Sequence, residues 1–224
     1  MVNVRSNECE RRRQLIAVAE RVFLEKGYHL ATMDDIARLA GVSKKTIYVE
    51  FAGKAALFDA LLAERLAPLA APIPEDGRPM AAVLSEYLLS VARIALSPRQ
   101  IALTRLMVAE SPHSPEVAQA LRAQAVCNGD SALDAWLATQ AARGALRLPD
   151  ARQAGAMLFG MSIGELLLAQ LIKADPPPAP SEVARRIELA VGVFLAAYAQ
   201  PAGAPPLRAA ARGPARPRPG APPP

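Results

Sequence analysis

Apolar side chains recur three or four positions apart along most of the chain, which is the spacing that places them on one face of an α-helix. The run containing Val83, Tyr87, Leu88 and Val91 is a clear example. No segment shows the sustained alternation of apolar and polar residues that a half-buried strand requires, and the abundant Ala and Leu residues favour helices. The pattern therefore predicts an all-α protein.

We expect about nine helices in total. A three-helix DNA-binding domain and a fourth, connecting helix fall within residues 11–66, and the later helices cover residues 80–96, 98–108, 115–137, 151–172 and 182–199. Pro98 and Pro115 each open a helix, because a first-turn residue needs no amide donor. Ser181 is the expected cap of the last helix, and Gly129 would bend or interrupt the helix that begins at Pro115.

The segment from Thr32 to Lys54 predicts two short helices that meet at a glycine. Thr32 and Asp35 have the spacing of a capping box, in which side chain and backbone of the two residues bond reciprocally. Gly41 ends the first helix by adopting a left-handed conformation at low cost, and Ser43 caps the second. Two helices joined by a short turn of this kind are the outline of a helix-turn-helix DNA-binding motif.

Polar residues occupy the outward side of the second helix. Lys44, Lys45 and Thr46 fall in its first turn, where helix-turn-helix proteins contact base edges in the major groove. Tyr48 points outward, so its hydroxyl can reach a phosphate, whereas Ile47 faces the interior. Each piece is common by itself, since adjacent lysines usually form a solvated surface. Their fixed order is what favours DNA binding.

The segment from about Arg11 to Arg65 resembles the DNA-binding domain of the TetR family of transcriptional regulators. RRRQLIAVAERVFLEKGY matches the family's supporting first helix, and GVSKKTIYVEF matches its recognition segment. The DNA-binding residues that the resemblance implies are Thr32, Ser43, Lys44, Lys45, Thr46, Tyr48 and Lys54. Two residues depart from the family's pattern. Glu50 places an acid near the expected path of the DNA backbone, and Gly53 removes the side-chain cap of the fourth helix.

A second resemblance concerns the C-terminal part of the chain. The run RLMVAE at residues 105–110, followed by a proline-containing loop and a long helix, is similar to the C-terminal domain of the AefR-like subgroup of TetR regulators. The two resemblances imply a DNA-binding domain with the start of the connecting helix in residues 1–66, and a helical ligand-binding and dimerisation domain in residues 67–199. The composition of residues 200–224 predicts a disordered, basic, proline-rich tail.

Residues 151–172 are the most apolar segment and are long enough to span a membrane. Glu165 and Gln170 within it argue against a span, and a helix buried by its own protein and a partner is the better explanation. The TetR resemblance implies that this helix and the last one pair with their counterparts in a second subunit; the alternative is that both only close the monomer core. The expected interface residues are Gly160, Gly164, Leu168, Val191 and Phe194.

The formal net charge of +5 is distributed unevenly. Residues 1–65 carry eleven basic and nine acidic residues, residues 66–199 carry eleven and twelve, and residues 200–224 carry four arginines and no acid. With nine prolines, the last segment cannot pack a core. Either it is a solvated extension of no specific use, or it adds non-specific DNA affinity through counterion release.

The TetR resemblance implies a homodimer that binds double-stranded operator DNA. We expect a repressor that leaves a palindromic operator when a small apolar or amphipathic effector binds the C-terminal domain. Adaptable or flat side chains suited to that site are Met107, Trp136, Met157, Phe159 and Met161. Any helical core uses the same residue types. The alternative is a constitutive DNA-binding or protein-interaction module without a small-molecule ligand.

The composition argues against an enzyme. The chain has two histidines, His29 and His113, and neither lies in a recognisable catalytic motif. Cys9 and Cys127 match no disulfide framework and no metal-ligand spacing, so we expect neither a cofactor nor a metal. The N-terminus is charged where a signal peptide would need an apolar core. These features predict a cytoplasmic protein without membrane association.

Overall fold

The structure is a computed structural model of the chain, and it describes residues 2–67, 71–124, 131–173 and 176–199. Within these ranges every regular element is a helix, and Leu146 and Ala199 form an isolated antiparallel β-bridge. The predicted all-α fold is confirmed. The expected tail after residue 199 lies outside the described residues, as do Cys127 and Gly129.

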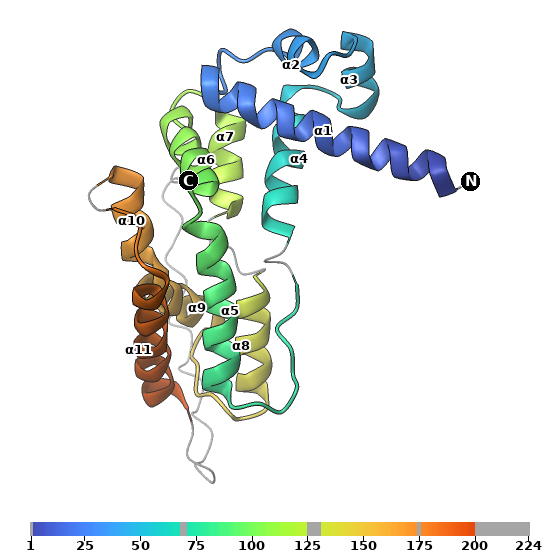
Figure 1. Ribbon diagram of the computed structural model, residues 1–224. Coiled ribbons are helices and arrows are strands. Elements are labelled where there is room, and N and C mark those ends of the chain that lie inside the picture. The colour runs from blue at the N-terminus through green and yellow to red at the C-terminus, as the bar shows by residue number, and fades with distance from the viewer. Residues whose placement is uncertain (1, 68–70, 125–130, 174–175, 200–224) are drawn as a thin grey trace, which may run out of the picture.

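Four helices form the N-terminal part of the molecule. They are α1 (Val2–Lys26), α2 (Met33–Ala40), α3 (Lys44–Glu50) and α4 (Lys54–Leu66). α1 crosses the upper end of the molecule with α2 and α3 above it, and α4 descends from it toward the C-terminal helices (Figure 1). α1 packs against both α2 and α4, and α3 packs against α2. α1 is therefore the central helix of the N-terminal part.

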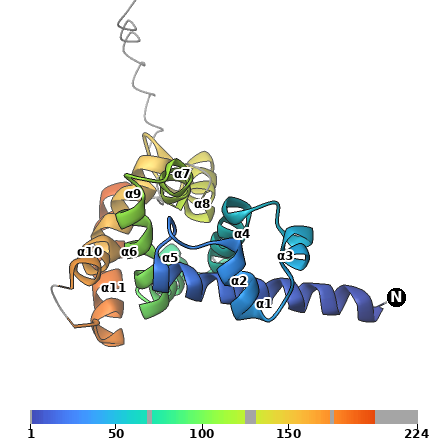
Figure 2. The same cartoon turned by 90° about the horizontal axis from the view of Figure 1, so that it is seen from above.

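The remaining helices form the C-terminal part. They are α5 (Met80–Ala95), α6 (Pro98–Glu110), α7 (Pro115–Gln124), α8 (Ala132–Ala142), α9 (Ala151–Phe159), the π-helical turn η2 (Gly160–Gly164), α10 (Glu165–Ile172) and α11 (Pro180–Tyr198). α11 packs along α5 and η2, and α8 packs along α9. Seen from above, α1–α4 lie on one side and α9–α11 on the other (Figure 2).

Two separate clusters of buried apolar side chains fill the molecule, and we call them the N-terminal core and the C-terminal core. The N-terminal core contains the rings of Phe23, Tyr28 and Phe58, whose centroids lie 4.9 to 5.5 Å apart. It also includes Leu103 and Met107 from α6. The C-terminal core is built mainly from α5, α8, α9 and α11. The N-terminal helices therefore complete their core with residues from well beyond position 66.

The helix predicted for residues 115–137 is two helices. α7 ends at Gln124, and α8 begins at Ala132 after Ser131, whose extended backbone (φ −76°, ψ 151°) and hydroxyl cap it. The described residues therefore contain ten helices rather than nine, with α9, η2 and α10 counted as one continuous helix. The interruption was anticipated at Gly129, but a capping serine defines the new start.

The last helix begins two residues earlier than predicted. Ala179 occupies its cap position and Pro180 its first turn, so Ser181 is not the cap. Proline at the first position needs no amide partner, and this makes a side-chain cap less necessary.

α9, η2 and α10 form one helix of 22 residues that is long and apolar enough to cross a membrane, with a mean hydropathy of 1.6. A single helix of this kind is weak evidence for a membrane span, since core helices of soluble proteins have the same composition. Arg186 of α11 donates to Met161 O at 3.1 Å and to the Glu165 carboxylate at 2.5 Å. In η2, Ser162 Oγ donates to Leu158 O at 2.7 Å. The two contacts of Arg186 join the helix to α11, whereas the Ser162 contact lies within the helix itself.

A buried carboxylate joins α1 and α4 to α6. Glu20 is only 1% exposed, and Arg65 of α4 donates to its Oε2 at 2.6 Å. Arg99, in the first turn of α6, donates to Oε1 at 2.5 Å and also to Oε2. The hydrogen bond with Glu20 raises the pKa of Arg99 above its ordinary value. Because a buried charge needs such partners, this triad fixes the start of α6 against the N-terminal helices.

Candidate nucleic-acid interface

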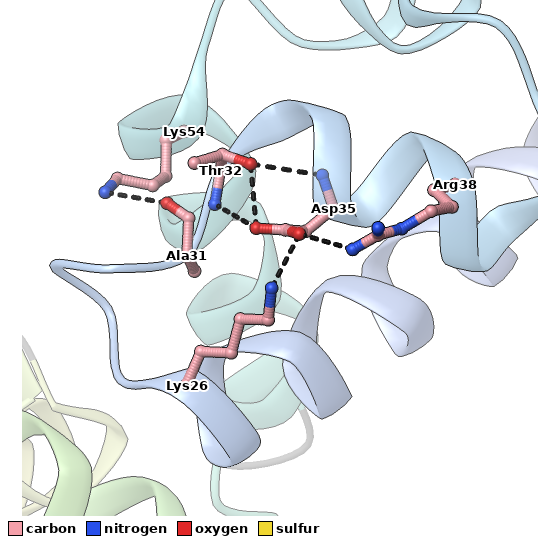
Figure 3. A network of polar contacts seen from close by, with 6 residues as sticks. All are labelled: Lys26, Ala31, Thr32, Asp35, Arg38 and Lys54. Carbon is pink, nitrogen blue, oxygen red and sulfur yellow. Dashed lines mark hydrogen bonds and ion pairs between the residues drawn. The ribbon is translucent and has the colours of Figure 1, made fainter.

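The entry to α2 is fixed by Thr32 and Asp35 (Figure 3). Thr32 Oγ1 accepts from Asp35 N at 3.1 Å, and both Thr32 donors, its N–H and its O–H, go to Asp35 Oδ2. Lys26 and Arg38 donate to Asp35 Oδ1 at 2.6 and 2.7 Å. The hydrogen bond from Lys26, followed by that from Thr32, lowers the pKa of Asp35 to about 2. The predicted capping box is confirmed, and Thr32 uses its donors inside the protein.

The turn between α2 and α3 is closed by Gly41 and Ser43. Gly41 adopts the left-handed conformation (φ 67°, ψ 28°), and its amide donates to the carbonyl oxygens of Ala37 and Arg38. Ser43 Oγ accepts from Thr46 N at 3.2 Å. Both predicted signals are therefore confirmed, and they orient α3 relative to α2.

α3 presents different chemistry on its two sides. Ile47 is fully buried and Phe51, which follows the helix, is 3% exposed, so both lie in the N-terminal core. Lys44, Lys45 and Tyr48 are exposed on the outer side. The short helix is thus held by apolar contacts from behind and carries cations and a phenol in front.

The two lysines of α3 differ in their partners. Lys44 Nζ lies 2.9 Å from a carboxylate oxygen of Asp34 in α2, and the hydrogen bond that Lys44 donates to Asp34 raises the pKa of Lys44. Lys45 is exposed and takes part in none of the ion pairs among the described residues. Lys45 can therefore approach a ligand directly, whereas Lys44 must first leave Asp34.

Lys54, expected at a phosphate, is already bound within the protein. Its Nζ donates to the carbonyl oxygens of Tyr28, His29 and Ala31 at 2.8, 3.1 and 3.1 Å. It also lies 4.5 Å from the centroid of the Tyr28 ring. An ammonium group has three N–H donors, so all are used. In this structure Lys54 fastens the connection between α1 and α2 to α4, and a phosphate would have to displace one of these bonds.

Some residues of this surface were missed by the sequence analysis. Arg11 pairs with Glu50 at 2.9 Å, and Arg12 donates to Glu50 O at 3.1 Å while its guanidinium lies 4.4 Å from the centroid of the Phe51 ring. The acid that departs from the family's pattern is therefore neutralised by α1. Val49, 74% exposed on the outer side of α3, was also not assigned. The only signal for the arginines was the basic run at the start of the chain.

The five residues expected to bind a ligand do not gather at one place. Met107 is fully buried in the N-terminal core, to which the other four residues do not belong. Trp136 is buried in the C-terminal core, and Phe159 and Met161 pack against that core. Met157 is 49% exposed. The residue types suited both a ligand site and a core, and periodicity alone could not separate the two.

An open hollow of about 680 Å³ lies where the connection between α1 and α2 meets the end of α6. Its lining residues are His29, Ala109, Glu110, Pro112 and His113. Glu110 accepts the backbone N–H of His29 at 3.2 Å. The fold thus brings both histidines of the chain together. The described residues contain no group of three or more His, Cys, Asp or Glu that could hold a metal ion.

Two of the residues expected at a dimer interface lie inside the protomer. Val191 and Phe194 are each 1% exposed and belong to the C-terminal core, so their assignment to an interface is wrong. Leu168 is 57% exposed, Gly160 is exposed and Gly164 is half-buried. These three positions remain available to a partner.

A capped α2–turn–α3 unit, with a buried apolar side and an outer side of cations, defines a helix-turn-helix DNA-binding protein. Comparison with known families extends this assignment over most of the chain. Residues 15–61 match the family described as bacterial regulatory proteins of the tetR family, and residues 82–200, more than half of the chain, match the C-terminal domain of AefR-like transcriptional repressors. The chain belongs to the TetR family of DNA-binding transcriptional regulators.

Similarity to individual proteins is strongest in the N-terminal helices. The transcriptional activator FasR of Mycolicibacterium smegmatis is 51% identical over 53 residues, which are 24% of this chain and 24% of FasR. The regulator TtgR of Pseudomonas putida is 49% identical over 53 residues, 24% of this chain and 25% of TtgR. The chain therefore matches only about a quarter of the length of these relatives.

Solved structures resemble nearly the whole molecule. The flavonoid-responsive regulator FrrA has a TM-score of 0.71 at 25% identity, covering 85% of this chain and 97% of FrrA. A TetR-family regulator from Pseudomonas syringae pv. tomato has a TM-score of 0.70 at 27% identity, covering 86% of this chain and 98% of its own.

Proposed function

We propose that this protein is a homodimeric repressor that binds a palindromic operator and leaves it when a small apolar or amphipathic molecule binds among the C-terminal helices. The observation that carries the proposal is the outer side of α3, where Lys44, Lys45 and Tyr48 are exposed on a helix anchored by the buried Ile47. An exposed helix side of this chemistry fits the major groove.

The relatives support the details to different degrees. The match to AefR-like repressors supports repression, and the description of FrrA as flavonoid-responsive supports a flat, largely apolar effector. FasR is an activator, so the direction of regulation needs its own measurement with a reporter gene. The proposal places the protein in the cytoplasm, where it acts by binding rather than by catalysis.

A second copy of the chain is the partner that we assign to the outer sides of α10 and α11. Leu168 and Ile172 lie one turn apart on α10 and are 57% and 67% exposed. Leu189 and Val193 lie one turn apart on α11 and are 70% and 51% exposed. Two-fold pairing would bury these side chains in a self-complementary interface. The two α3 helices would then contact half-sites about 34–36 Å apart, which is one turn of DNA.

α6 is the element through which we expect the two parts to communicate. Arg99 in its first turn holds Glu20 of α1, and Arg105 in its middle donates to Leu171 O at the end of α10 at 2.9 Å. If α6 can occupy two positions, a ligand that binds the protein more tightly when α6 is in one of them would shift α6 to that position. The N-terminal helices, which are held by α6, would move with α6. Residues 1–66 would carry the DNA contacts and residues 67–199 the ligand and dimer contacts, with α6 and α7 shared by both.

The test of DNA binding is a selection of random duplex DNA by the full-length protein at near-physiological salt. We expect enrichment of one palindrome whose half-sites lie one helical turn apart. A Lys44→Ala/Lys45→Ala variant should enrich nothing above background, because it lacks both outer cations, whereas His113→Ala should enrich the same palindrome. If the folded wild-type protein enriches no sequence, the operator-binding proposal is wrong.

The test of the dimer is the mass measured by sedimentation. Leu189→Glu and Val193→Glu should each produce monomers, because a carboxylate buried between two copies has no partner there. Val108→Glu is the matched control, since Val108 is 51% exposed on α6 and should leave the dimer intact. If both Leu189→Glu and Val193→Glu remain dimers, the interface lies elsewhere.

A further inference from the structure

Val49 lies on the part of α3 that points most directly away from the protein. It is 74% exposed, while Ile47 is fully buried. At 3.6 residues per turn, Lys45 and Val49 each lie about 160° around the helix from Ile47, on opposite sides, and so within about 40° of each other. The two side chains therefore share the centre of the outer side, with Lys44 and Tyr48 toward one edge.

The chemistry of Val49 restricts what it can recognise. Its isopropyl group neither donates nor accepts a hydrogen bond. In the major groove the base edges present donors and acceptors, and the C5-methyl group of thymine is the apolar feature. Covering the polar edge of another base with an isopropyl group would take away its water without a replacement bond, which is unfavourable. A valine at this position favours thymine and disfavours the alternatives.

The spacing of Val49 and Lys45 adds a geometric condition. Four residues along a helix span about 6 Å, and successive base pairs are about 3.4 Å apart. The two side chains thus reach bases one or two steps apart. A lysine in the major groove commonly donates to O6 and N7 of guanine, and Lys45 has no ion pair among the described residues to restrain it.

We propose that Val49 is a specificity-determining residue that contacts the methyl group of a thymine in each half-site, one or two base pairs from a guanine contacted by Lys45. This inference rests on the proposed operator binding and specifies its base preference. Isolated exposed apolar side chains are ordinary on protein surfaces. Val49 differs because the helix that carries it is the one presented to DNA.

The experiment replaces thymine by uracil, one position at a time, in the selected operator. Uracil keeps the hydrogen-bonding edge of thymine and lacks only the methyl group. For the wild-type protein we expect one thymine in each half-site at which the replacement weakens binding about fourfold, the loss that corresponds to one buried methyl group. Replacement at other thymines should change the dissociation constant less than twofold.

Variants connect that thymine to Val49. In Val49→Ala the sensitive position should lose its response to uracil, because the side chain no longer reaches the methyl group. Val49→Thr, which keeps one methyl, should retain part of the response. Val108→Ala is the matched control on α6 and should behave as wild type. The base contacted by Lys45 lies one or two base pairs from the sensitive thymine. In Lys45→Gln the preferred base at that position should change from guanine to adenine, since glutamine pairs with the adenine edge.

Two outcomes would overturn the inference without touching operator binding itself: an operator in which no thymine responds to uracil, or a response that is the same in wild type and Val49→Ala. A selection that enriches no sequence would instead refute the proposed function, and the base contact with it. The two failures are therefore distinguishable in the same series of measurements.

Discussion

The N-terminal and C-terminal helices bury separate apolar cores, but the exposed apolar side chains are arranged differently on their outer surfaces. Around the N-terminal core the exposed apolar side chains, such as Leu30, Leu39 and Val49, are dispersed among charges. On α10 and α11 they come in pairs one turn apart, Leu168 with Ile172 and Leu189 with Val193. The first surface needs no apolar partner to cover it and is suited to a charged partner. The second is suited to another apolar surface.

Side-chain caps fix helix starts in both parts of the molecule, but not at the last helix. α2 and α3 begin at Thr32 and Ser43, whose side chains accept from the first amides, and the Asp35 carboxylate binds Lys26 and Arg38. Ser97, Ser131 and Asp150 cap α6, α8 and α9 in the same way, whereas α11 has no side-chain cap. The position of α11 therefore depends on its packing along α5 and η2.

Removing one large side chain from each core tests whether the cores are independent. Phe58→Ala and Phe194→Ala should each lower the free energy of unfolding by about 3–5 kcal/mol, because both rings are 1% exposed. Phe58→Ala should abolish DNA binding and preserve the dimer, while Phe194→Ala should weaken the dimer more. Urea unfolding and sedimentation measure the two effects. Equal loss of both functions in both variants would show that the cores act as one.

The connection between the two parts is tested at Glu20. Glu20→Gln should cost about 2–3 kcal/mol, because it leaves Arg65 and Arg99 without their carboxylate. Thermal unfolding gives the effect. Glu25→Gln, at an exposed position of the same helix, should stay within about 0.5 kcal/mol of wild type. A variant at Glu20 as stable as that control would mean that the triad does not hold α6 in place.

Close packing in the C-terminal part is tested at Gly155. A Cβ at Gly155 would collide with Asp134 Oδ1, so Gly155→Ala should destabilise by about 1–3 kcal/mol. A Cβ at Gly160 meets nothing within 4 Å, so Gly160→Ala should be neutral or stabilising by up to about 1 kcal/mol. Chemical denaturation of the two variants side by side gives the contrast, and equal stabilities would contradict the tight approach of α8 to α9.

The smallest effects are expected at the local caps. Thr32→Ala should cost about 1 kcal/mol through loss of the α2 cap. The pKa of Asp35 is lowered from 3.8 to about 2, so the folded state favours its ionised form. That contribution is present above about pH 5 and is lost as the pH falls toward 2. Melting temperatures measured across this range should fall less steeply in Asp35→Asn than in wild type, and identical slopes would exclude the contribution.

The α2–turn–α3 unit could be predicted because its signals are local. Thr32 with Asp35, Gly41 and Ser43 act on amides within a few residues, so their spacing in sequence is enough. The start of α8 carries the same signal, Ser131 with Asp134, and it was overlooked.

Other features depend on neighbours distant in sequence. α11 is apolar on more than one side, so periodicity could not show that Val191 and Phe194 face inward while Leu189 faces out. Lys54 binds carbonyl oxygens whose position is set by the path of the α1–α2 connection. The placement of Met107 likewise depends on how α6 docks against α1.

The π-helical turn η2 changes the phase of the helix that contains it. Before the turn, Ala154 and Leu158 are buried, whereas no residue of α10 is fully buried. A π-turn holds one residue more than an α-turn, which rotates everything beyond it by about 100°. The first half of this continuous helix thereby packs along α8 and the second half contacts α6, with Leu168 and Ile172 exposed. Deleting a single residue within η2 would turn Leu168 and Ile172 away from the side on which a second copy would meet them.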